Sequence, residues 1–119
     1  MKEFRGPDDL MDEELSAVCF VRDYVEFHFD GPILRALSTV RIVDSSGSVT
    51  SSTGMDGWRD ALCKLIGLEV AEVVVDELHA ITVRFSTGSA LVVPIDNNSK
   101  VAGEAAHFLA RVNAPLVVW

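Results

Sequence analysis

The chain has 119 residues, the length of one domain, and 49% of them are hydrophobic. Its formal net charge of −8 argues against a nucleic-acid partner, because affinity for a phosphate backbone comes largely from clustered Lys and Arg. The longest apolar run, residues 90–95, is far shorter than the ~20 residues that a membrane-spanning helix requires. A transmembrane segment is therefore excluded.

The N-terminal segment is acidic. It carries Asp8, Asp9, Asp12, Glu13 and Glu14 behind Pro7. We expect an acidic N-terminal arm over residues 1–16 and one domain over residues 17–119. The arm is either a mobile, solubilising terminus or a docking surface for a basic protein partner. Because the N-terminus lacks the residue order of a secretory signal, the sequence predicts a cytoplasmic protein in which Cys19 and Cys63 are reduced and buried.

The first strand is predicted before an Asp30-Gly31 turn, because apolar and polar side chains alternate there. Its apolar face carries Val21, Val25, Phe27 and Phe29, and its polar face carries Tyr24, Glu26 and His28. Residues 33–43 form the returning segment. Residues 45–54, almost all Ser, Thr or Gly, are predicted to be a mobile loop.

An amphipathic helix is predicted over residues 55–66. Its apolar stripe contains Trp58, Ala61, Leu62, Leu65 and Ile66. Thr53 and Asp56 have the spacing of a capping box, and Gly67 suits the left-handed position that ends a helix. Three strands follow, in which apolar residues recur with a period of two over 71–75, 81–85 and 91–95. Trp58 and Phe85 are both expected to lie in the core.

The C-terminal part is predicted to form a second helix and a last strand. Val101, Ala105, Phe108 and Leu109 have helical spacing, and residues 116–119 suit a strand. The predicted fold class is therefore α+β: a single domain with a curved antiparallel sheet of five to six strands and two helices packed against it. The high apolar content also predicts a homodimer that forms through a remaining sheet face or edge.

The sequence predicts no metal site and no cofactor. Glu26, His28 and Asp30 have the chemistry of metal ligands, but along a strand they span about 13 Å, too far for one ion. The pair Glu26 and His28 supplies only one side of a zinc site, because no second pair of ligands stands at suitable spacing. Glu104 and His107 match half of a di-iron site, and their simpler interpretation is the polar face of a helix.

No enzyme class is predicted either. Cys63 is placed near the C-terminal end of its helix, where the helix dipole disfavours a thiolate. The serine-rich segment 45–54 lacks both the G-x-S-x-G nucleophile elbow and the lysine of a phosphate-binding loop. The motifs therefore favour a protein without catalytic activity.

Residues 62–106 resemble small bacterial proteins of unknown function, some of which are suspected immunity proteins encoded beside toxin genes. The shared pattern is a Leu-Ile-Gly-x-x-Val unit followed by a hairpin, and it consists here of Leu65, Ile66, Gly67, Val70, Phe85 and Gly88. The acidic-aromatic ending of such units is absent, since Ala105 follows Glu104. The resemblance implies a fold and transfers no active site.

Two functions follow as hypotheses. The first is a non-catalytic, immunity-like domain that binds a protein partner. The alternative is a small-ligand-binding or accessory domain with a pocket between the sheet and the helices. The candidate ligand or partner surface contains Tyr24, Glu26, His28 and Trp58.

Overall fold

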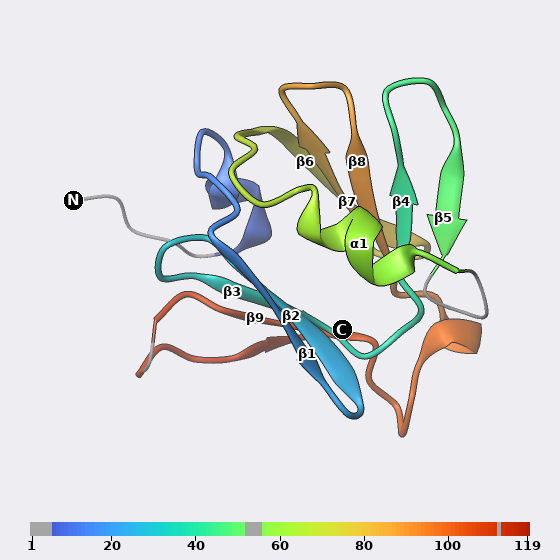
Figure 1. The fold of residues 1–119 in the computed structure, drawn as a ribbon. Helices are drawn as coiled ribbons and strands as arrows, with labels where there is room; N and C mark the ends of the chain where they lie inside the picture. The colour runs from blue at the N-terminus through green and yellow to red at the C-terminus, as the bar shows by residue number, and fades with distance from the viewer. Residues whose placement is uncertain (1–5, 52–55, 112) are drawn as a thin grey trace.

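Two five-stranded antiparallel sheets make up most of the protein (Figure 1). The computed structural model describes residues 6–51, 56–111 and 113–119. The first sheet has the order β1 (Ala17–Val21), β2 (Tyr24–His28), β3 (Ile33–Ala36), β9 (Ala106–Leu109) and β10 (Val117–Val118). The second has the order β5 (Val49–Ser51), β4 (Arg41–Val43), β8 (Ala90–Pro94), β7 (Ala80–Phe85) and β6 (Val70–Asp76).

Helical structure is sparse in the described residues. It consists of the α-helix α1 (Trp58–Cys63) and the short 3-10 helices η1 (Pro7–Leu10) and η2 (Asn97–Ser99). Figure 1 shows α1 beside the second sheet, on the side of the β1–β2 hairpin. The predicted α+β fold with two helices on one sheet is therefore wrong, and the protein is mostly β.

The two sheets share one buried core. Side chains at alternate positions enter it, as the period of two predicts. From the first sheet they include Phe27, Leu34 and Phe108, and from the second Ile81, Val83, Phe85, Leu91 and Val93. The Asp30-Gly31 turn is also confirmed, because both residues have positive φ angles, 54° and 138°. Antiparallel pairing in the second half of the chain is likewise confirmed.

The predicted second helix, residues 101–109, is instead a tight turn followed by strand β9. Ala102 and Gly103 both have positive φ, and Val101 pairs with Glu104 across them. A left-handed pair of residues cannot continue a right-handed helix, and glycine is itself a poor helix residue. Strand β9 then lies between β3 and β10, so it satisfies the backbone groups of both neighbours.

The helix predicted over 55–66 is shorter in the structure. It begins at Trp58, after Gly57 with φ 80°, and ends at Cys63. Thr53 lies outside the described residues, and so does the predicted capping box. Gly67 has the expected left-handed conformation, with φ 91°. Its N–H donates to the carbonyl of Leu15 at 2.7 Å, so this glycine ties the end of the helical segment to the N-terminal part of the chain.

Part of the loop predicted over 45–54 is ordered as strand β5, which pairs with β4. The turn between them is organised by one carboxylate. Asp44 Oδ1 accepts hydrogen bonds from the backbone N–H groups of Ser46 and Ser48, each at 2.9 Å. This polar sequence thus forms a hairpin because an aspartate accepts hydrogen bonds from the backbone N–H groups of its turn. Such local bonding is typical of Asp. Residues 52–54 lie outside the described residues.

The N-terminal segment contributes to the core. Leu10 and Leu15 are fully buried, although the sequence predicts an arm over residues 1–16. The C-terminal strand is confirmed: β10 pairs with β9, and the N–H of Trp119 donates to the carbonyl of Ala106 at 2.9 Å. Both ends of the described chain are therefore held by the domain.

Replacing Phe85 by alanine is expected to lower the free energy of unfolding by roughly 3–5 kcal/mol, because the substitution leaves a cavity in the core. The Phe85 side chain is 2% exposed, whereas Leu78 is 77% exposed and serves as the control. Leu78→Ala should change the free energy by less than about 0.5 kcal/mol. Chemical denaturation measures both values, and similar losses in the two variants would contradict the core assignment.

Candidate functional site

A row of polar side chains crosses the outer face of the first sheet. Cross-strand pairing sets Cys19 opposite Glu26, Glu26 opposite Arg35, and Arg35 opposite His107. We call these four residues the polar row. They come from four adjacent strands, so the order of the strands alone places them side by side.

Glu26 is the centre of the polar row. Its Oε2 accepts from Arg35 Nε at 3.0 Å and lies 2.9 Å from Arg35 Nη2. Its Oε1 lies 3.1 Å from His28 Nε2, and because a carboxylate only accepts, this nitrogen donates. Burial alone would raise the pKa of Glu26, but the hydrogen bonds from Arg35 and His28 outweigh burial and lower the pKa. Glu26 is therefore held as a carboxylate.

Arg35 links Glu26 to the far end of the row. Its guanidinium carbon lies 5.0 Å from the centre of the Tyr24 ring, in a cation–π contact. Its Nη1 lies 3.1 Å from His107 Nδ1. Since arginine has no acceptor, we infer that His107 Nδ1 carries a lone pair and that Nε2 donates to Glu104 Oε1 at 3.0 Å. Glu104 and His107 were predicted to lie on the polar face of a helix, which is wrong, because they come from a turn and from strand β9.

The four residues predicted as a ligand or partner surface are divided between two places. Tyr24, Glu26 and His28 share one face of β2, and Arg35 joins the first two. Trp58 lies on α1, where it packs edge-to-face on Phe20 at a ring-centre distance of 5.7 Å. Tyr24 and Trp58 help to line a groove of about 330 Å³ at the end of the β1–β2 hairpin, and Glu26 and His28 lie outside its lining.

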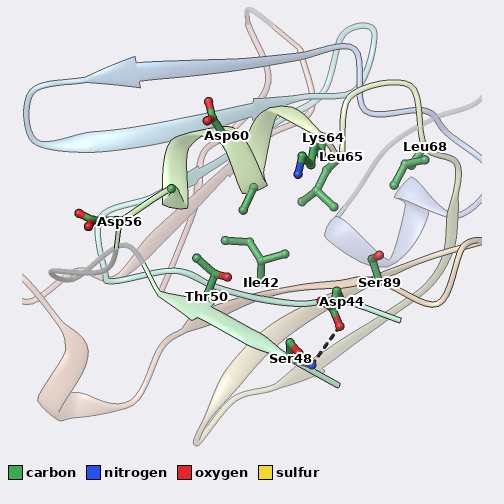
Figure 2. Close-up of a pocket in the computed structure, with 12 residues that line it drawn as sticks. Ile42, Asp44, Ser48, Thr50, Asp56, Asp60, Lys64, Leu65, Leu68 and Ser89 are labelled. Atoms are coloured by element: carbon green, nitrogen blue, oxygen red, sulfur yellow. Dashed lines mark hydrogen bonds between the residues drawn. The ribbon is translucent and has the colours of Figure 1, made fainter. Parts of the chain in front are cut away.

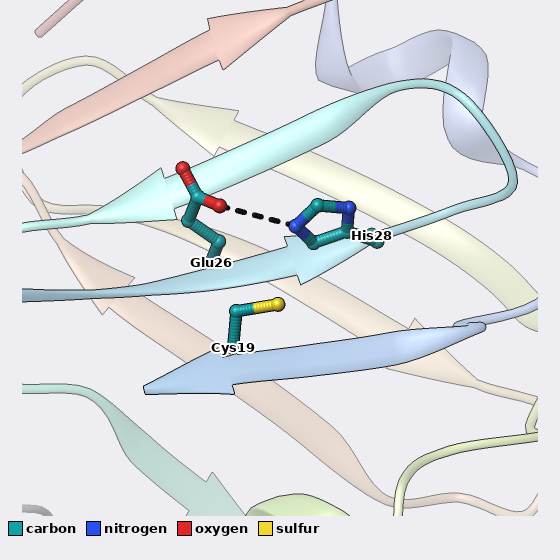
Figure 3. A group of neighbouring side chains, drawn as sticks. All are labelled: Cys19, Glu26 and His28. Carbon is teal, nitrogen blue, oxygen red and sulfur yellow. Dashed lines mark hydrogen bonds and ion pairs between the residues drawn. The ribbon is translucent and has the colours of Figure 1, made fainter. Parts of the chain in front are cut away.

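Both cysteines are exposed, which corrects the prediction that they are buried. Cys19 lies on the outer face of β1, and Figure 3 shows it beside Glu26 and His28. The possible ligand atoms of these three residues all lie within 4.8 Å of one another. The sequence prediction missed this cluster because it placed Val21 in one strand with Val25, Phe27 and Phe29, whereas in the structure Val21 is exposed and ends a separate strand, β1. The two-residue turn Arg22-Asp23 between β1 and β2 is the signal that fixes the register and reveals Cys19 as a neighbour.

A groove of about 430 Å³ lies between α1 and the second sheet (Figure 2). Its wall on the sheet side includes Ile42, Asp44, Ser48, Thr50 and Ser89, and its wall on the helix side includes Asp56, Asp60, Ala61, Lys64, Leu65 and Leu68. The lining therefore combines aspartates, hydroxyl groups and one lysine with apolar side chains. None of the four residues predicted as a ligand or partner surface, Tyr24, Glu26, His28 and Trp58, lines this groove.

An acidic surface runs along the N-terminal segment and β6. It contains the exposed residues Asp8, Asp12, Glu14, Glu69 and Glu72. Glu14 and Glu69 pair directly across an antiparallel bridge. We call these five residues the acidic surface.

No family model matches the chain, and searches of curated proteins and solved structures likewise give no significant match. The resemblance to small bacterial proteins therefore stays a prediction. In the part of the chain that the structure describes, the helices are too short and too polar to cross a lipid bilayer.

The Asp44 turn at the rim of the groove gives a prediction on pH. The hydrogen bonds from the Ser46 hydroxyl and the Ser48 N–H lower the pKa of Asp44. Ser46→Ala removes the hydroxyl, so the pKa should rise toward the ordinary value for aspartate, which a carboxyl NMR titration measures. The control Ser89→Ala lines the same groove without bonding Asp44, and it should leave the pKa unchanged.

The lowered pKa of Asp44 also makes the stability of the protein depend on pH. The folded-state pKa of Asp44 is lowered, so its stabilising contribution is present above the unfolded-state pKa and is lost as the pH falls through the folded value. The free energy of unfolding of Ser46→Ala should therefore fall less than that of the wild type as the pH is lowered. An Asp44 titration that is identical in the wild type and the Ser46 variant would contradict this account of the turn.

Proposed function

We propose that this protein is a non-catalytic, cytoplasmic binding protein that docks a basic protein partner on its acidic surface. The pairing of Glu14 with Glu69 carries the proposal. Like charges placed directly opposite on adjacent strands destabilise the free protein. A Lys or Arg side chain of a partner would relieve this repulsion on binding, and it would gain an ion pair at the same place.

The acidic surface is rigidly held, which favours binding. The N–H of Asp12 donates to the carbonyl of Val70 at 2.8 Å, and the N–H of Val70 donates to the carbonyl of Glu13 at 2.8 Å. The buried side chains of Leu10 and Leu15 anchor the same segment. The backbone that carries these charges is therefore already ordered, which lowers the entropy cost of association.

Charge complementarity also supports a basic partner. With a net charge of −8, the whole chain attracts cations, and an acidic patch steers a positively charged protein toward this side. An immunity protein that neutralises a basic toxin is the most concrete version of the proposal, and this version rests on the resemblance described above.

A lysine-rich synthetic peptide tests the proposal. Glu69→Lys should weaken binding of the peptide roughly tenfold, a loss of about 1.4 kcal/mol. The same substitution should raise the free energy of unfolding by roughly 0.2–1 kcal/mol, because it replaces a like-charge pair with an ion pair. Titration calorimetry at low salt measures the first quantity, and denaturation measures the second.

The matched control is Asp23→Lys, which changes the net charge equally in the β1–β2 turn, away from the acidic surface. It should weaken peptide binding far less than Glu69→Lys. Equal weakening in the two variants would show that net charge alone attracts the peptide. Loss of stability in Glu69→Lys would contradict the repulsion that carries the proposal.

The groove beside α1 supports a second candidate function, the binding of a small ligand. Its volume of about 430 Å³ lies in the range of small-molecule sites. Its lining residues include three aspartates, Asp44, Asp56 and Asp60, against the one basic residue Lys64, and this negative balance favours a ligand that carries positive charge, such as a polyamine.

Titration with spermidine distinguishes the two candidates. If the groove is the site, Asp60→Asn should weaken spermidine binding by roughly tenfold, whereas Glu69→Lys should not. The reverse result would place the cation on the acidic surface, and it would contradict the second candidate.

A further inference from the structure

We propose that Cys19, Glu26 and His28 form a binding site for one zinc ion on the outer face of the first sheet. The proposal is independent of the acidic surface. Each residue supplies one ligand atom, and these atoms lie within 4.8 Å of one another. In a tetrahedral zinc site, bonds of about 2.0–2.3 Å place ligand atoms roughly 3.3–3.8 Å apart. The cluster therefore requires only small side-chain adjustments.

The backbone of the β1–β2 hairpin positions the three ligands. Glu26 and His28 occupy alternate positions of β2, so both side chains leave the same face of the strand (Figure 3). Cys19 lies opposite Glu26 in the pairing of the two strands. Along one strand, Glu26, His28 and Asp30 are too widely spaced to bind one ion. In the structure, Cys19 of the neighbouring strand takes the place that Asp30 cannot fill.

Glu26 is oriented for this role by Arg35. The guanidinium holds Oε2, while Oε1 is directed toward His28, at 3.1 Å from Nε2. A carboxylate that binds a metal through one oxygen is commonly hydrogen-bonded through the other, and such partners support the affinity of the site. Arg35 is itself held by Tyr24 and His107. The supporting contacts thus extend across three strands.

The donor set selects the ion. One thiolate, one imidazole and one carboxylate suit zinc, whereas magnesium and calcium prefer oxygen ligands alone. Three protein ligands leave a fourth position for water or another ligand, and the cluster lies partly exposed on the sheet face. On binding, the Cys19 thiol releases its proton to solvent. The His28 proton moves from Nε2 to Nδ1 by exchange with solvent, so that the neutral ring binds the ion through Nε2.

Cobalt substitution tests the site in the full-length protein. Titration with Co²⁺ should give one ion per chain, with thiolate-to-metal absorption in the near ultraviolet and intense visible bands typical of tetrahedral cobalt. Zn²⁺ should then displace the cobalt and remove the bands. Cys19→Ser and His28→Gln should each weaken zinc binding by about 100-fold, because each removes one of three ligands.

The chain supplies matched controls. Cys63→Ser removes the other exposed cysteine, and His79→Ala removes a histidine whose Nδ1 lies 2.9 Å from the carboxylate of Asp76, a similar pair without a cysteine. Both variants should keep the affinity and the spectrum of the wild type. Circular dichroism of Cys19→Ser should match that of the wild type, because the substituted side chain is exposed. Equal zinc affinity in Cys19→Ser and the wild type, or no binding by the wild type, would overturn the proposal.

Discussion

The register of the first sheet is the constraint on which the rest of the structure depends. Because side chains alternate between the faces of a strand, a shift of one residue would exchange the core face with the outer face. The short turns at Arg22-Asp23 and Asp30-Gly31 fix the register. The same pairing therefore buries Phe27 and Leu34 and aligns the polar row on the opposite side.

The two charged regions of the molecule differ in how their charges are satisfied. On the first sheet, Glu26 is neutralised by Arg35, and Glu104 accepts from His107. On the acidic surface, Glu72 lies 3.8 Å from Arg84 Nε, but Glu14 is paired across the bridge with another acidic residue, Glu69. Internal pairing stabilises a fold, whereas repulsion that the fold maintains lowers stability in the absence of a partner. This contrast favours the acidic surface as the protein-binding region and the polar row as a preorganised site.

Sequence patterns predicted those parts of the fold in which one face of a strand is buried, such as Ala80–Phe85, because burial imposes a period of two. They failed at residues 101–109, because a short apolar pattern there fits either a helix or a strand. The left-handed turn at Ala102-Gly103 prevents a helix, and strand β9 forms after it. The site was only partly predictable for a different reason. Tyr24, Glu26 and His28 are close in sequence, whereas Arg35 and His107 join them through pairing between strands.

The hydrogen bond between His28 and Glu26 determines how strongly and how reversibly the proposed site would bind zinc. Glu26 already has partners in His28 and Arg35, so its charge is satisfied before any ion binds. Zinc must replace the His28–Glu26 bond, which at a partly exposed position stabilises the protein by on the order of 1 kcal/mol. This competition lowers the affinity for zinc by about fivefold. The guanidinium of Arg35 adds repulsion toward the cation, so the geometry favours an exchangeable ion over a permanent structural one.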